Sequence, residues 1–176
     1  QQLAEVKAAR LAAGFPVAGV EFKSLGTEVK VVAAKRQVEL WVAAYGNVDD
    51  GGDYMPHGAA TKSIADDGPN GQGLIKFFAN HSLLLGPAIV VEEHRKGVLM
   101  VGQVDAAADL DRYLAHAESK ALGHGSIGYL VRRASRGTHE GKSVRVLEEV
   151  TLLEGSLVAW PMNRACKVEG VKAMRY

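Results

Sequence analysis

Residues 74–104 read LIKFFANHSLLLGPAIVVEEHRKGVLMVGQV, and this stretch decides the expected fold. Short apolar runs at Leu74–Ala79, Pro87–Glu93 and Val98–Val104 are typical of β-strands. The polar residues between the last two runs predict a hairpin turn. Because the runs follow one another without regular helical crossovers, a parallel doubly wound sheet is disfavoured.

Strand-like patterns continue on both sides of this stretch. Upstream they cover Glu28–Ala34 and Gln37–Tyr45, and the second of these alternates polar and apolar residues in its first half. Downstream, Ser126–Arg133 and Val144–Leu153 predict two more strands, which a polar loop at Ala134–Lys142 would join. Strands therefore make up most of the expected fold.

Helical patterns are fewer. Residues Ala107–Leu122 place their apolar side chains on one face, and Gly123 follows as a C-terminal stop. A shorter helix is expected at Ala59–Ala65. Many short strands with few helices predict an α+β domain, mainly an antiparallel β-barrel with flanking helices. We expect residues 1–14 to form an N-terminal arm or short helix and residues 15–176 to form one domain.

The composition restricts the class of protein. Hydrophobic residues make up 47% and charged residues 23%, as in ordinary globular domains. A net charge of +1 gives no basic excess for a large nucleic-acid interface. No apolar run approaches the roughly 20 residues that span a bilayer, and the N-terminus lacks the apolar centre of a signal peptide. We therefore expect an intracellular chain that is not secreted and binds neither membrane nor specific nucleic acid.

Among the histidines, His81 is best placed for chemistry. It follows an apolar strand and precedes another apolar stretch, where a ring can be held rigidly and still reach a cleft. A buried structural histidine is the alternative. His94 and His139 lie in polar turns and His116 lies off the apolar face of its helix, so we expect these three on the surface.

Ser126 lies in the segment GHGSIGY, residues 123–129. Glycines on both sides allow the close approach that a substrate or an oxyanion requires. The chain continues as a strand, so the segment is not the nucleophile elbow of hydrolases, and a simple turn serine is the alternative. His124 is a second possible base, although side chains two residues apart on a strand run parallel.

Glu154 lies within an otherwise uncharged run, VTLLEGSLVAW at residues 150–160. A carboxylate there is costly unless it is paired, and orienting a histidine would supply the partner. A glutamate that faces water at the end of the barrel is the alternative.

Other chemistry finds little support in the sequence. Asp49, Asp50 and Asp53 fail the calcium-loop pattern because Ala60 stands at its twelfth position, so we interpret them as a turn. No histidine and cysteine spacing matches a zinc site, and Cys166 has no histidine near it in the sequence. We expect no metal and no organic cofactor.

Several motifs in this order resemble the prohead maturation proteases of tailed bacteriophages, serine proteases related to the herpesvirus assembly protease. The resemblance covers residues 37–168. Its motifs are GNVDDGGD at 46–53 with HGAA at 57–60, NH at 80–81, GP at 86–87, GVLMVGQV at 97–104, GSIGY at 125–129 and LEGSLVAWPMNRA at 153–165. The chain departs from the family pattern at Ser82, which is commonly aspartate, and at Gly155, which is commonly valine.

The resemblance implies roles for five residues. His81 would be the general base and Ser126 the nucleophile. Glu154 corresponds in position to the third catalytic residue of the herpesvirus relatives, which is a second histidine. Asn163 and Arg164 correspond to the loop that serves the oxyanion.

The resemblance also implies a herpesvirus-protease-like fold and a place of action. The chain would act in the host cytoplasm, inside the assembling procapsid, and would associate with itself. Its substrates would be the scaffold protein, the major capsid protein and the protease itself. Two alternatives remain: a catalytically silent protein of the same fold that binds capsid or scaffold, and a β-barrel interaction module unrelated to viruses.

Overall fold

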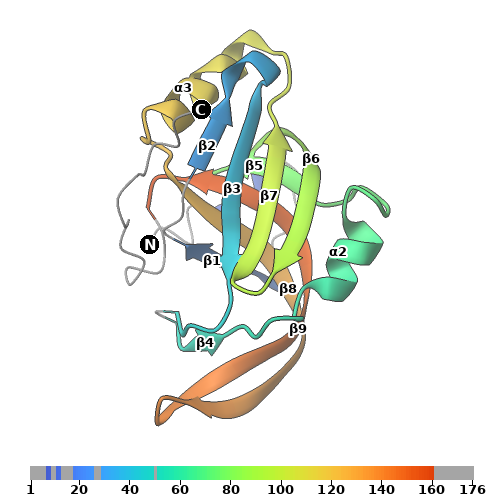
Figure 1. Cartoon of the computed structure of the whole chain (residues 1–176), viewed down its shortest axis with the longest axis vertical. Coiled ribbons are helices and arrows are strands. Elements are labelled where there is room, and N and C mark those ends of the chain that lie inside the picture. The colour runs from blue at the N-terminus through green and yellow to red at the C-terminus, as the bar shows by residue number, and fades with distance from the viewer. Residues whose placement is uncertain (1–6, 9–10, 13–17, 26–28, 50, 161–176) are drawn as a thin grey trace.

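A computed structural model describes residues 7–8, 11–12, 18–25, 29–49 and 51–160 (Figure 1). The strands are β1 (Val20–Leu25), β2 (Val29–Val32), β3 (Gln37–Ala44), β4 (Asp53–Tyr54), β5 (Lys76–Ala79), β6 (Leu83–His94), β7 (Gly97–Gln103), β8 (His124–His139) and β9 (Lys142–Val158). The helices are α2 (Thr61–Asp67) and α3 (Asp111–Glu118), with short 3-10 turns at Ala33–Lys35 and Ala108–Leu110. No helix in these ranges has the length and apolarity to cross a bilayer.

The strands form one mixed sheet in the order β1-β8-β9-β5-β6-β7-β3-β2, with β4 added to β9. The predicted β-rich fold with flanking helices is confirmed, but the sheet is open rather than a closed barrel. Within the described ranges, β1 and β2 stand at its two ends without pairing to each other. The sheet is also not purely antiparallel, because β4 and β5 both run parallel to β9.

The sheet bends along β6, whose first half pairs with β5 and whose second half pairs with β7. This bend lays the β8–β9 half over the β3–β7 half. A Cβ at Gly125 would lie 1.9 Å from the Trp41 carbonyl oxygen, and one at Gly155 would lie 2.5 Å from Met100 Sδ. A side chain at Gly155 would require Met100 and Val42 to shift. The core fills the space between the halves with buried side chains that include Leu40, Met100 and Ile127.

Strand β9 has neighbours on both edges. β8 pairs with it along one edge, from His139↔Lys142 to His124↔Val158. On the other edge, β4 pairs at residues 145–146 and β5 at residues 154–157. Between them, Ala59 O accepts the Val150 N–H at 2.9 Å and Ser63 Oγ accepts the Leu152 N–H at 2.9 Å. The part of β9 around Glu154 is therefore held by backbone bonds on both sides.

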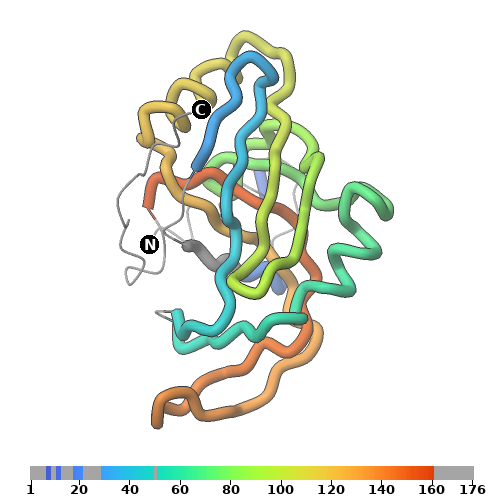
Figure 2. The backbone as a smooth tube through the Cα atoms, in the orientation of Figure 1, coloured from blue at the N-terminus to red at the C-terminus, as the bar shows by residue number. Residues whose placement is uncertain are grey.

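Two predicted elements differ from the structure. The helix expected at Ala107–Leu122 is shorter, because Lys120 adopts a left-handed conformation, φ 61°, before Gly123 is reached. The loop expected at Ala134–Lys142 is instead strand, and β8 and β9 continue to a tight turn at Glu140 and Gly141, both with positive φ. Figure 2 shows this hairpin projecting from the body. Most residues of the projection are exposed, although Val144 is buried.

We predict that Ser63→Ala lowers the free energy of unfolding by about 1–3 kcal/mol, because it leaves the Leu152 N–H without its partner. Ser63 is 4% exposed, so water does not readily replace the hydroxyl. Urea denaturation measures the change. Exposed Ser143 serves as the control, since Ser143→Ala should change stability by no more than about 0.5 kcal/mol. Equal effects of the two substitutions would contradict the role of Ser63.

Candidate functional site

His81 lies at the point where the chain leaves β5. Asn80 donates its N–H to Leu157 O at 2.8 Å, which extends the β5–β9 pairing by one residue. Asn80 and His81 then both adopt left-handed conformations, with φ 49° and φ 59°. Asparagine and histidine are among the residue types most enriched in that region. The consecutive left-handed residues reverse the chain direction and bring the imidazole back toward β9.

The returning imidazole meets Glu154. His81 Nδ1 and Glu154 Oε1 are 2.6 Å apart, and the two side chains are 8% and 1% exposed. An ionised carboxylate only accepts hydrogen bonds, so His81 Nδ1 carries the proton and donates it. In this tautomer the lone pair is on Nε2, on the other side of the ring. The alternative of a Glu154 facing water is wrong.

Ser126 stands on the neighbouring strand, on the same face as Glu154. It lies directly opposite Ser156 in the β8–β9 register, and Ser156 and Glu154 are two residues apart on β9. Side chains opposite each other in an antiparallel pair have Cβ atoms about 5 Å apart. Ser126 and Ser156 each have 0% exposure. The sheet therefore gathers Ser126, Ser156 and Glu154 on one buried face.

A glycine makes room for the carboxylate. Gly128 is the residue opposite Glu154 in the register. A Cβ at this position would lie 2.4 Å from Glu154 Oε1, well inside van der Waals contact. The second glycine of the GSIGY motif is thus required by the position of the carboxylate rather than by a turn.

Ser156 also contacts this pair, which the sequence did not predict. Its hydroxyl donates to Glu154 Oε2 at 2.7 Å and accepts the His81 N–H at 3.1 Å. The Glu-x-Ser spacing on a strand was the available signal, because it puts both side chains on one face. The pairing with residues 80 and 81 was not visible in the sequence.

The sequence singled out further candidate residues besides this cluster. Asn163 and Arg164 fall outside the described residues. Asp49 forms a turn as expected, since its Oδ1 accepts the N–H groups of Gly51 and Asp53, both at 2.9 Å. His124 is half-buried on β8, and its Nδ1 has no hydrogen-bond partner among the described residues.

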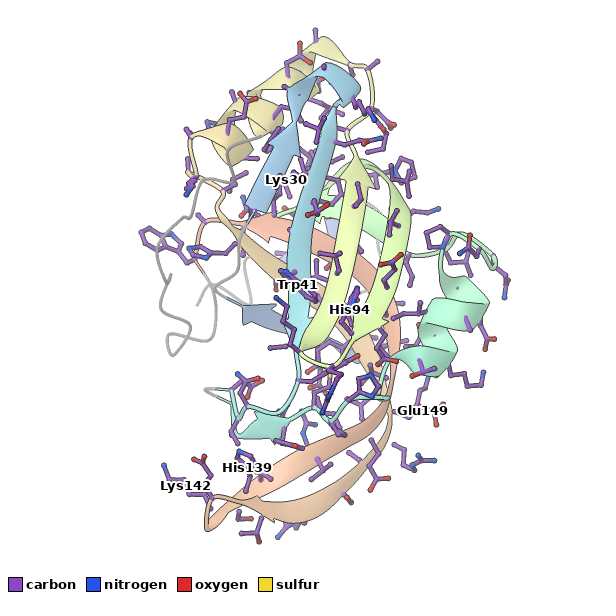
Figure 3. The ribbon with its side chains drawn as sticks, in the orientation of Figure 1. Lys30, Trp41, His94, His139, Lys142 and Glu149 are labelled. Atoms are coloured by element: carbon purple, nitrogen blue, oxygen red, sulfur yellow. The ribbon has the colours of Figure 1, made fainter. Side chains whose placement is uncertain are left out.

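Two histidines predicted on the surface form ring contacts far from His81 in sequence and structure. His94 packs edge-on to Trp41, with ring centroids 5.3 Å apart, and its side chain is 45% exposed. His139 packs on Tyr54 at 4.7 Å near the end of the hairpin. Figure 3 labels both histidines, His94 at the β6–β7 turn and His139 on the projecting hairpin.

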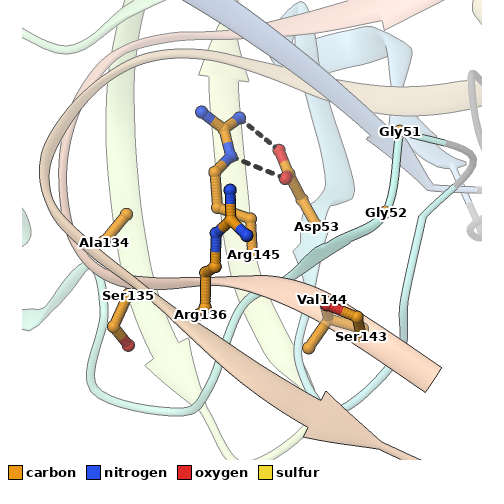
Figure 4. Close-up of a pocket in the computed structure, with 9 residues that line it drawn as sticks. All are labelled: Gly51, Gly52, Asp53, Ala134, Ser135, Arg136, Ser143, Val144 and Arg145. Atoms are coloured by element: carbon orange, nitrogen blue, oxygen red, sulfur yellow. Dashed lines mark hydrogen bonds and ion pairs between the residues drawn. The ribbon is translucent and has the colours of Figure 1, made fainter.

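A cavity of about 590 Å³ lies at the base of the hairpin, away from His81 (Figure 4). Arg145 there donates to both oxygens of Asp53, at 2.8 and 2.6 Å, and to Glu21 at 2.6 Å. These hydrogen bonds raise the pKa of Arg145 further above its ordinary value. Through these ion pairs with Asp53 and Glu21, the arginine links the hairpin to β4 and β1.

The described residues offer no group of three His, Cys, Asp or Glu side chains that could share a metal ion. The chemistry available at the buried face is that of a hydroxyl, an imidazole and a carboxylate. This set is the one used in nucleophilic catalysis by serine, where a base activates the hydroxyl and a carboxylate orients the base.

The model of one protein family, the caudovirus prohead serine proteases, matches residues 27–176. The chain belongs to this family. It is therefore a protease of capsid maturation, and the family predicted from the sequence motifs is confirmed. No curated protein matches the chain.

A solved structure supports the fold of this prohead protease. The capsid assembly protease of bacteriophage T4 aligns with a TM-score of 0.58 and 14% sequence identity. The alignment covers 81% of this chain and 98% of the T4 chain. At this identity the likeness establishes a common fold.

We predict that this prohead protease loses stability as the pH falls below about 6.5, and that His124 contributes to the loss. Burial lowers the pKa of His124 below the ordinary histidine value of 6.5, so the unfolded chain takes up the proton first. The stabilising contribution is present above that pH and is lost below it. In urea denaturation at pH 7 and pH 5.5, His124→Gln should reduce the difference between the two pH values.

His116→Gln is the matched control, because His116 is exposed on α3. It should leave the pH dependence as in the wild type. A His124→Gln variant with the same pH dependence as His116→Gln would contradict the assignment.

Proposed function

We propose that this chain is a serine endopeptidase in which Ser126 is the nucleophile, His81 the general base and Glu154 the residue that orients His81. The observation that carries the proposal is the 2.6 Å contact between His81 Nδ1 and Glu154 Oε1. It fixes the tautomer whose Nε2 can accept a proton. Ser126 lies on the same face of the sheet, one strand away from Glu154.

The reaction proceeds through an acyl-enzyme. His81 Nε2 takes the proton of the Ser126 hydroxyl while Oγ attacks the scissile carbonyl carbon. The imidazolium, stabilised by Glu154, then protonates the leaving amine, and the acyl group remains on Ser126. A water molecule, deprotonated by the same imidazole, attacks the ester and releases the second product. His81 and Ser126 return to their starting protonation states.

The oxyanion that forms at the scissile carbonyl needs hydrogen-bond donors close to it. We assign this role to backbone N–H groups near Asn163 and Arg164, on the family resemblance of that segment. A single donor of this kind contributes about 3–4 kcal/mol of transition-state stabilisation.

The burial of the cluster has a consequence for substrate access. Ser126 has 0% exposure and His81 6%. A peptide therefore reaches Ser126 only after the groups that cover it have moved. Burial also strengthens the contact between the imidazolium and the carboxylate, because water does not screen it.

The proposed substrates are the scaffold protein, the N-terminal region of the major capsid protein and the protease itself. The family supports this choice, since a prohead protease acts on the proteins of the capsid precursor. The proposed place of action is the interior of the assembling procapsid, where crowding would favour self-association.

We predict that Ser126→Ala and His81→Ala each slow the processing of co-expressed scaffold by roughly 10⁴-fold or more. Glu154→Gln should be impaired less, because the histidine and serine remain. Gel analysis of the scaffold over time measures processing. His116→Ala, on exposed α3, should process at the wild-type rate. Full processing by the Ser126→Ala or His81→Ala variant would refute the assignment of that residue.

The second candidate function is a catalytically silent protein of the same fold that binds capsid or scaffold. The buried contact between His81 and Glu154 favours the enzyme, since binding alone does not require an oriented imidazole. A serine-directed fluorophosphonate separates the two functions. The enzyme should gain the mass of one adduct, and a silent protein should gain none.

A further inference from the structure

We propose that Ser156 is a positioning residue of this site, an inference that rests on the proposed function of His81, Ser126 and Glu154. One hydroxyl contacts both members of the histidine–carboxylate pair. Ser156 Oγ lies 2.7 Å from Glu154 Oε2 and 3.1 Å from the His81 backbone nitrogen. With 0% exposure, Ser156 makes these contacts away from water.

The direction of both hydrogen bonds follows from the chemistry of the partners. The His81 N–H only donates, so Ser156 Oγ accepts that bond with a lone pair. The Glu154 carboxylate only accepts, so the single hydroxyl proton of Ser156 points to Oε2. The hydroxyl is therefore held in one orientation. It is committed to Glu154 and is not available for deprotonation by His81 Nε2, which distinguishes Ser156 from the proposed nucleophile.

The bond to Oε2 determines how the carboxylate faces the imidazole. A glutamate side chain rotates about several bonds, and the Glu154 side chain occupies the space that a side chain at Gly128 would need. With Oε2 held by Ser156, Oε1 points at His81 Nδ1. Hydrogen bonds to ionised groups are shorter and stronger than those between neutral groups, so this hydroxyl restricts the rotation of the Glu154 carboxylate.

The bond from the His81 N–H acts on the backbone. Asn80 and His81 are consecutive non-glycine residues in the left-handed region, a strained conformation that persists only where the surroundings hold it. Ser156 Oγ supplies one of the hydrogen bonds that hold this turn. Ser156 therefore fixes both the backbone that carries the imidazole and the carboxylate that orients it, without contacting the reacting atoms.

Ser63 provides a matched control for the test. Both serines are buried and both accept a backbone N–H, but Ser63 bonds Leu152 and does not reach Glu154 or His81. We expect Ser156→Ala to lower the rate constant for fluorophosphonate reaction with Ser126 by roughly tenfold to a hundredfold. Ser63→Ala should leave this rate near the wild-type value. Ser156→Thr, which keeps the hydroxyl, should retain most of it.

A second readout does not depend on activity. The proton on His81 Nδ1 gives a downfield ¹H NMR signal when it is bonded to a carboxylate. This signal should move upfield or broaden in Ser156→Ala and stay in place in Ser63→Ala. If the wild-type chain does not react with the fluorophosphonate, the proposed function fails, and the signal still decides whether Ser156 orients the pair.

Equal effects of Ser156→Ala and Ser63→Ala on both readouts would overturn the inference, as would an unchanged reaction rate in Ser156→Ala. Should Ser156→Ala fail to fold, Ser156→Cys replaces it, because a thiol preserves much of the volume with a weaker donor. Ser156→Cys should then react more slowly than Ser156→Thr, and equal rates would contradict the role of the hydroxyl.

Discussion

The site depends on one contact, the hydrogen bond between the His81 imidazole and the Glu154 carboxylate. A carboxylate placed inside a sheet is stable only with partners, and Glu154 has one for each oxygen, His81 on Oε1 and Ser156 on Oε2. The contact with His81 in turn depends on the parallel pairing of β5 with β9, which brings residue 81 to the face that carries residues 154 and 156. The chemistry is thus set by a backbone pairing.

The surrounding architecture keeps that pairing rigid. β9 is hydrogen-bonded along both edges, by β8 on one side and by β4, Ala59 and β5 on the other. Glycines allow the layers to approach closely, with Gly125 and Gly155 facing the opposite half of the sheet and Gly128 facing the carboxylate. Gly125 and Gly128 of the GSIGY motif are therefore packing requirements of the β8–β9 pair, which also carries Ser126 and Glu154.

Local patterns in the sequence predicted most strands, because alternation and apolar runs report which side chains are buried. They failed where the structure depends on contacts between residues that are far apart in the sequence. The predicted closed barrel was wrong. Closure would need pairing between the end strands β1 and β2, and a local sequence pattern carries no information about such a pairing. The polar residues at Ala134–Lys142 predicted a loop, because an exposed strand and a loop have similar polar compositions.

The same distinction holds for the site. Position in the sequence singled out His81, Ser126 and Glu154 but left a structural or exposed role open for each. The contact between residues 81 and 154 resolves the position of Glu154, and strand pairing was needed to find it. Ser156 lies within the motif at residues 153–165. Its contact with His81, however, depends on the turn at Asn80 and His81, and the sequence did not predict the left-handed conformation of these two residues.

The most direct test is a crystal structure of the chain after reaction with a peptidyl diphenyl phosphonate. Phosphorus should be bonded to Ser126 Oγ, with His81 Nε2 within about 3.2 Å of that oxygen or of a phosphonate oxygen and Nδ1 still bonded to Glu154. Phosphorus on a different side chain, or an imidazole turned away from Ser126 in the adduct, would contradict the proposed catalytic site.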